Sequence, residues 1–257
     1  GEKTVKKQTA RAATVFLLPL AACICYRQFL YSLTVSAWGD LRAGFIETIA
    51  VRLLCSVSVA VLVHRAAHVL FTRKKKPSAH GAFGVCMLVA LNNFPFSAYL
   101  SGRARLTAGA EDVLLFAAVC LSVSLFEELL FRGFLLSAMY RQFGPGRKSR
   151  VAAVLLSAAV FALFHLLNLL SGAAPLAVVL QVGYSFLVGA MTGALFLLSG
   201  NILLPIAVHA VYNFGGLLFP ELGQGDVRMD GATIVVTVVV ALCAAVVLSR
   251  LLWRQEE

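Results

Sequence analysis

Charged side chains are scarce in this sequence, and acidic ones especially so. Of its 257 residues only 13% are charged, with 12 Asp and Glu against 22 Lys and Arg. A soluble domain carries about a quarter of its residues as charges, so a water-exposed surface over the whole chain is excluded. No long polar linker, low-complexity tract or internal repeat interrupts the sequence either, which predicts a single domain over residues 1–257.

Long apolar runs take the place of those polar tracts. Hydrophobic residues make up 60% of the chain, and its mean hydropathy is +0.87. A helix needs about 20 apolar residues to cross a bilayer, and runs of about that length predict spans near 12–31, 45–71, 82–100, 112–140, 151–170, 175–199, 201–219 and 232–252. The runs lack the alternation of a membrane β-barrel. We therefore expect an all-α, polytopic membrane bundle of about eight helices, whose first apolar stretch is a retained anchor.

The net charge of +10 has two explanations, nucleic-acid binding and membrane topology, and the positions of the basic residues distinguish them. With eight spans, fourteen Lys and Arg fall on one side, in the N-terminal segment, the second and fourth loops and the C-terminal end. Four fall in the opposite loops: Arg42, Arg103, Arg105 and Arg228. Basic residues concentrate in cytoplasmic loops. This predicts a multi-pass protein of a bacterial plasma (inner) membrane, with both termini cytoplasmic and anionic lipid on that side, and no nucleic-acid partner.

Smaller features of the spans predict breaks and close packing. The NNFP segment at 92–95 interrupts the third span, where proline removes a helical hydrogen bond. The GPG segment at 144–146 ends the fourth span. Gly183, Gly189 and Gly193 are expected to let the sixth span approach a neighbouring helix closely. The six cysteines all fall within expected spans, where small apolar packing residues are the simplest interpretation.

Two adjacent carboxylates in the fourth span require an explanation, because a charge at mid-bilayer costs at least about 2.5–3.5 kcal/mol. The segment SLFEELLFRGFLL places Glu127, Glu128 and Arg132 inside an apolar run. Glu128 and Arg132 are four residues apart on one helical face, where an ion pair offsets part of the cost of burial. Glu127 is rotated by about 100° from Glu128, so its partner must lie on another helix.

Two other spans each present a pair of polar or aromatic residues at i, i+4 spacing. The fifth has Phe161 and His165 in FALFHLLN, and the seventh has His209 and Asn213 in HAVYN. With a rise of about 1.5 Å per residue, Glu127, His165 and His209 can meet near the midplane or somewhat towards the cytoplasm. Each feature alone has a bland explanation, such as a packing histidine or an interhelical asparagine. Their occurrence in three separate spans predicts a shared polar cavity.

The ordered set EExxxR, FxxxH and HxxxN, each in its own apolar helix, resembles the CPBP (also called Abi) family of intramembrane proteases. That family includes the CAAX prenyl endopeptidases and bacterial proteins linked to bacteriocin self-immunity. The motifs fall within a core over residues 112–219 and read Glu127-Glu128-Leu-Leu-Phe-Arg132, Phe161-Ala-Leu-Phe-His165 and His209-Ala-Val-Tyr-Asn213.

The resemblance implies an eight-helix fold and a glutamate-dependent endopeptidase embedded in the membrane. Carried over by position, Glu127 is the general base that activates water, and His165 assists it. His209 and Asn213 stabilise the oxyanion, as preorganised donors do in a dry site. The supporting pair is Glu128 and Arg132. The implied substrate is a peptide or the tail of a lipid-modified protein.

Two alternatives stay open on the sequence. Glu127, His165 and His209 also match the His₂Glu ligand set of catalytic zinc. The HExxH spacing is absent, so we expect catalysis without a metal or other cofactor. The second alternative is a non-proteolytic membrane protein, such as an immunity factor, a scaffold or a proton-coupled carrier. A carrier should show duplicated halves with broken helices, and this sequence shows no such duplication.

Overall fold

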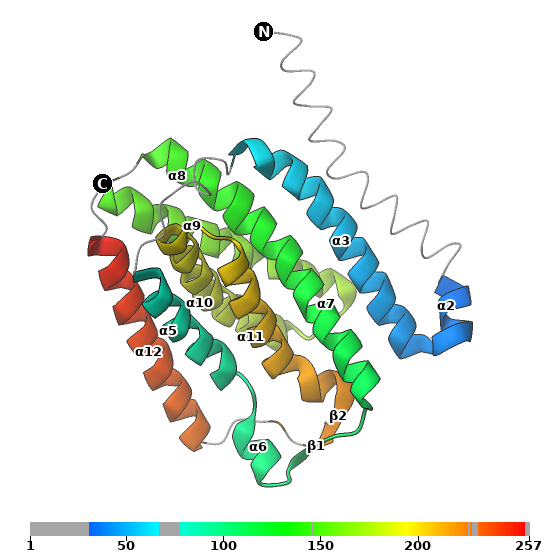
Figure 1. Ribbon diagram of the computed structural model, residues 1–257. Coiled ribbons are helices and arrows are strands. Elements are labelled where there is room, and N and C mark those ends of the chain that lie inside the picture. The colour runs from blue at the N-terminus through cyan, green and yellow to red at the C-terminus, as the bar shows by residue number, and fades with distance from the viewer. Residues whose placement is uncertain (1–30, 67–77, 145, 226, 228–230, 255–257) are drawn as a thin grey trace, which may run out of the picture.

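The computed structural model describes residues 31–66, 78–144, 146–225, 227 and 231–254, and within them it is a bundle of apolar helices (Figure 1). In chain order the elements are α2 (Tyr31–Trp38), α3 (Asp40–Ala66), α5 (Ser78–Asn92), α6 (Phe96–Leu100), β1 (Ala104–Leu106), α7 (Ala110–Glu128), η2 (Leu129–Leu136), α8 (Ser137–Phe143), α9 (Arg147–Phe164), η3 (His165–Ser171), α10 (Pro175–Ser199), α11 (Leu203–Leu222), β2 (Gly223–Gly225) and α12 (Gly231–Arg254). The all-α, polytopic membrane fold predicted from the sequence is confirmed.

Within the described part of the chain, six helices are long and apolar enough to cross a membrane: Asp40–Val61, Ala110–Phe143, Arg147–Leu170, Pro175–Ser199, Leu203–Leu222 and Ile234–Arg254. The third expected span, 82–100, is instead the shorter helix α5, which stops at Asn92 and is followed by a turn and the one-turn helix α6. The break at the NNFP segment is thus confirmed. The first expected span, 12–31, lies outside the described residues except for its last position.

The connection between α8 and α9 shows how the sequence ends a span. Gly144 follows the last residue of α8 with φ +85°, a conformation that costs glycine little because it has no Cβ. Gly200 ends α10 in the same way, with φ +63°, and its N–H donates to the carbonyl of Phe196 at 2.8 Å. The predicted break at GPG is confirmed, and it starts α9 at Arg147.

Helices α9 and α10 pack closely at Gly189. A Cβ at this position would lie 3.1 Å from Cδ1 of Phe161 and 3.2 Å from Cα of Ala158, so a larger residue would push α9 away by a few tenths of an ångström. A Cβ on Gly193 would make ordinary contacts, from 3.5 Å outward. The prediction is wrong for Gly183, where a Cβ would meet nothing within 4 Å because the glycine faces open space.

The described helices pack into one bundle, with α7 against α3 and α11, α9 against α10, and α5 against α10, α11 and α12. Cys55, Cys86 and Cys120 are buried, as expected of packing residues, whereas Cys243 on α12 is exposed. Only 11% of the apolar window of α12 is buried within the bundle. That helix therefore presents most of its surface to lipid.

The two ends of the bundle differ in charge and in structure. At one end, the lower one in Figure 1, β1 and β2 pair antiparallel with Arg105 opposite Gln224 and link the loop after α6 to the end of α11. These three-residue strands were not predicted, because ARL and GQG are too short to show a strand pattern. The opposite end carries the basic α8–α9 connection and the last turn of α12 with Arg254. The described members of the two charge groups thus lie at opposite ends.

Candidate active site

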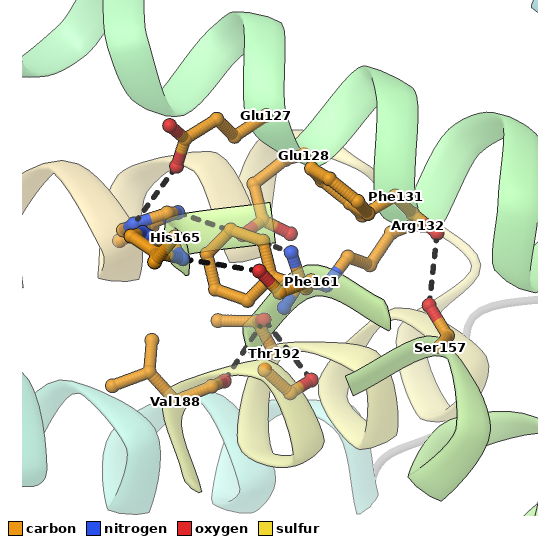
Figure 2. A network of polar contacts seen from close by, with 11 residues as sticks. Glu127, Glu128, Phe131, Arg132, Ser157, Phe161, His165, Val188 and Thr192 are labelled. Atoms are coloured by element: carbon orange, nitrogen blue, oxygen red, sulfur yellow. Dashed lines mark hydrogen bonds and ion pairs between the residues drawn. The ribbon is translucent and has the colours of Figure 1, made fainter. Parts of the chain in front are cut away.

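The fourth span changes its winding at the two glutamates. Helix α7 ends at Glu128, and a π-helix, η2, continues without a break over Leu129–Leu136. Two hydroxyls bond to carbonyls of this wider turn: Ser137 Oγ donates to Arg132 O at 3.0 Å, and Ser157 Oγ of α9 donates to Phe131 O at 3.1 Å (Figure 2). Such hydroxyls satisfy backbone groups that lipid cannot. π-Helical turns are frequent at functional sites, and nothing in the letters LLFRGFLL predicted this one.

Glu128 belongs to a fully buried network. Its Oε1 lies 3.1 Å from Arg132 Nη1, and the side chains of both residues are at most 1% exposed. The same oxygen accepts a hydrogen bond from His209 Nδ1 at 2.8 Å. The Arg132 guanidinium in turn lies 4.5 Å from the centre of the Phe161 ring, within cation–π distance. The Glu128 carboxylate therefore ties the fourth expected span to the seventh, and the Arg132 guanidinium ties the fourth to the fifth.

Glu127 faces a different environment from its neighbour. Its Oε2 lies 3.7 Å from Nε2 of His209, so its partner lies on another helix, as the rotation between adjacent helical residues predicted. One imidazole thus sits between two glutamates, with Nδ1 on Glu128 and Nε2 towards Glu127. Glu127 lines a cavity that Glu128 does not reach. Of the two carboxylates, only that of Glu127 is placed to meet a substrate.

His165 stands where α9 ends and the 3-10 helix η3 begins. Its Nδ1–H donates to the carbonyl of Phe161 at 3.0 Å, since a carbonyl can only accept. A neutral ring then carries its lone pair on Nε2, the nitrogen suited to accept a proton or a hydrogen bond from water. Figure 2 shows His165 and Phe161 facing Glu127 from across the site.

Phe161 is more than an ordinary core aromatic. Its ring meets His165 edge to face, with centroids 4.9 Å apart, and meets His209 in the same way at 5.8 Å. Its face covers Arg132. One buried ring thus fixes both imidazoles and caps the ion pair, and its own position depends on the missing side chain at Gly189.

A cavity of about 550 Å³ brings the predicted residues together. Glu127, His165, His209 and Asn213 all line it, and Phe161 forms part of its wall. The other two predicted residues, Glu128 and Arg132, lie behind this wall in the buried network. The shared polar cavity that the three motifs predicted is therefore present.

The cavity also has polar lining residues that sequence reasoning did not identify: Arg52, Asn93, Asn168, Gln181, Tyr184, Ser185, Tyr212 and Thr237. Asn168 donates to Gln181 at 2.8 Å, which joins η3 to α10. Asn93 Nδ2 donates to the carbonyl of Tyr212 at 2.8 Å, so this residue of the broken span both braces α11 and faces the cavity. Arg52 had a clear signal, a cation in an apolar run, which is the same signal that singled out the glutamates.

The zinc alternative requires three ligands around one point. Among the residues that the structure describes, no group of three or more His, Cys, Asp or Glu is placed to hold a metal ion. Both ring nitrogens of His209 face glutamates, and Nδ1 of His165 is bonded to a backbone carbonyl. As placed, the donors that a zinc ion would need contact one another or the backbone.

Comparison with known proteins finds a family match over part of the chain. Residues 109–215 match the family described as type II CAAX prenyl endopeptidase Rce1-like, and this stretch contains all three motifs. No curated protein and no solved structure matches the chain. Over residues 109–215, which are less than half of the 257 residues, the chain is thus similar to the Rce1-like type II CAAX prenyl endopeptidases, the kind of protein that its motifs resemble.

Proposed function

We propose that this chain hydrolyses a peptide bond within the membrane, in the C-terminal tail of a lipid-modified or otherwise membrane-associated protein. One observation carries the proposal: Glu127, His165, His209 and Asn213, which come from three separate spans, line a single cavity. The family match supports a CAAX-type endopeptidase.

Glu127 acts as the general base. A water held between the Glu127 carboxylate and Nε2 of His165 loses a proton to Glu127 as its oxygen bonds to the scissile carbonyl carbon. When the C–N bond breaks, the proton passes from Glu127 to the leaving amine, and the carboxylate is restored. His165 suits the task of orienting the water, because its Nδ1–H bond to Phe161 leaves Nε2 as an acceptor.

His209 and Asn213 stabilise the oxyanion. Asn213 supplies amide N–H donors, whereas His209 can donate from Nε2 only when both of its nitrogens carry protons. The Glu128 carboxylate accepts a hydrogen bond from Nδ1 and so fixes the orientation of the ring, and Arg132 holds the carboxylate in place. Glu128 and Arg132 are thus positioning residues that act through His209.

The test is cleavage of a farnesylated fluorogenic peptide with a four-residue CAAX tail by the full-length chain in liposomes. Glu127→Gln keeps the shape of the side chain but removes the base, and we expect kcat to fall by about 10²–10⁴-fold. Glu111→Gln is the control, since that glutamate is 83% exposed and pairs with Arg42 away from the cavity. Cleavage by Glu127→Gln at the wild-type rate would reject the proposal.

We also propose that catalysis needs no metal, because the described donors are arranged for proton transfer. Exhaustive dialysis against a chelator should leave the cleavage rate unchanged. A rate that is lost on chelation and restored by zinc alone would replace this mechanism with zinc-assisted hydrolysis on Glu127, His165 and His209.

The chain is a multi-pass membrane protein, and we propose that its basic end faces the cytoplasm of a bacterial cell, against anionic lipid. The α8–α9 connection and the end of α12 define this end. Single cysteines introduced at Lys148 and at Arg103 should differ in labelling by an impermeant maleimide on intact cells, with only the latter modified. The reverse pattern would invert the orientation.

A further inference from the structure

Arg52 is a cation within a membrane span, and the mechanism above gives it no task. It lies in α3, in the span Asp40–Val61, and it lines the same cavity as Glu127. Charged residues inside spans are rare, face the bundle interior or a wet cavity, and have an identifiable partner. An anion that pairs with Arg52 is therefore expected.

Two other arginines in the spans have protein carboxylates as partners. Arg42 pairs with Asp112 and, at 3.2 Å, with Glu111. Arg132 pairs with Glu128 at 3.1 Å. For Arg52, no carboxylate among the described residues lies within the 4.0 Å of an ion pair.

The guanidinium of Arg52 is instead held by an aromatic ring. Its central carbon lies 5.0 Å from the centre of the Phe126 ring, on the residue next to Glu127. The nearby Glu127 carboxylate is directed at His209. A cation–π contact orients a guanidinium without neutralising it, so Arg52 keeps its charge available to whatever enters the cavity.

The register of α3 and α7 places the Cα of Arg52 nearer to the β1–β2 end of the bundle than that of Glu127. The two helices run side by side in the same direction. Three contacts follow one another along them: Arg42 with Asp112, Phe45 with Phe116, and Arg52 with Phe126. At 1.5 Å per residue, the Cα of Arg52 stands about 15 Å above the first contact and that of Glu127 about 22 Å above it. Arg52 therefore approaches from the β1–β2 side of Glu127, away from the basic end.

We propose that Arg52 binds the free α-carboxylate at the C-terminus of the substrate and thereby directs cleavage to the chain end. A tail that enters from the basic end and lays its scissile bond against Glu127 points its terminus towards Arg52. The planar guanidinium can take both carboxylate oxygens at once. This role as a specificity determinant rests on the proposed function. It adds to that function the chemical group of the substrate that the enzyme recognises.

The test measures binding, so that it does not depend on cleavage. The probe is a fluorescent farnesylated peptide with a four-residue tail, made once as the free acid and once as the amide. It is titrated into full-length Glu127→Gln protein in phosphatidylcholine nanodiscs. We expect the acid to bind about 10–100-fold more tightly than the amide, as hydrogen bonds to a charged group allow. Adding Arg52→Ala should bring that ratio close to one, and Arg52→Lys should retain part of it.

The control is Arg42→Ala, which removes a cation from the same helix outside the cavity and should leave the acid-to-amide ratio intact. A merely structural role for Arg52 would weaken both peptides together and preserve the ratio. Equal affinities for acid and amide in the parent protein, or no binding of either, would overturn the assignment. Peptide affinity that depends on the anionic lipid content of the nanodisc, and not on the peptide terminus, would indicate that Arg52 binds a lipid phosphate. That result would also overturn the assignment.

Cleavage assays then separate this inference from the proposed function. If the wild-type chain cuts acid and amide peptides equally, and Glu127→Gln cuts neither, only the role of Arg52 fails. If the acid is preferred in binding but no Glu127-dependent cleavage occurs, the protease proposal fails and Arg52 stands as a carboxylate-binding residue.

Discussion

Removing one member of the buried Glu128–Arg132 pair should destabilise the protein strongly, and removing both charges should restore most of the loss. The two side chains are 0% and 1% exposed, so Arg132→Met leaves a carboxylate that water cannot reach. Breaking such a pair costs about 3–5 kcal/mol. For a domain of this size that corresponds to a fall in Tm of about 6–20 °C. Glu128→Gln added to Arg132→Met removes the stranded charge and keeps an acceptor for Nδ1 of His209.

A matched comparison is available in the same bundle. Arg42 and Asp112 form an ion pair whose side chains are 35% and 18% exposed, and Arg42→Ala should lower the Tm far less than Arg132→Met does, because water screens the pair. Unfolding can be followed with a thiol-reactive dye as the rise in labelling above that of the exposed Cys243, because Cys86 and Cys120 are buried and react only when the bundle opens. If Arg132→Met melts no lower than Arg42→Ala, or the double variant melts as low as Arg132→Met alone, the reasoning about the buried pair is refuted.

Four further changes test other parts of the site and of the bundle around it. His165→Ala should lower kcat by about 10²–10⁴-fold with little change in KM, and a change confined to KM would contradict a role in activating water. Gly189→Ala should destabilise the bundle by about 1–3 kcal/mol because its Cβ meets α9 at 3.1–3.2 Å. Gly183→Ala should instead raise stability by up to about 1 kcal/mol, because nothing lies within 4 Å of the added Cβ. Thermal melts that rank the two variants in the opposite order would count against this packing. Ser157→Ala removes the hydroxyl bonded to Phe131 O of the π-helix and should cost about 0.6–1.7 kcal/mol. A melt identical to wild type would show that the π-helix does not need that bond.

The membrane fold and the charged residues of the candidate site follow from local properties of the sequence. Hydropathy over about 20 residues decides whether a segment can cross a bilayer, and six such helices are present in the described chain. The cost of a buried charge singles out Glu127, Glu128 and Arg132, since each must have a reason to be there. Spacing within one helix then separates Glu128, which reaches Arg132, from Glu127, which does not. These inferences need no knowledge of how the helices pack.

Tertiary structure decided which groups meet across the bundle. That one imidazole, His209, bridges both glutamates depends on the rotation and depth of α11 against α7, and residue spacing within a helix says nothing about either. The π-helix at Leu129–Leu136 depends on hydroxyls and neighbours supplied by α9.

The position of Arg52 at the cavity could not be predicted either, although the sequence shows a cation within an apolar run. Only the parallel register of α3 and α7 brings it to the cavity of Glu127. The physical reason is common to all three cases. Desolvation and hydrogen bonding within a helix are set by neighbours in the chain, whereas an active site is set by contacts between segments whose relative positions depend on the packing of the whole bundle.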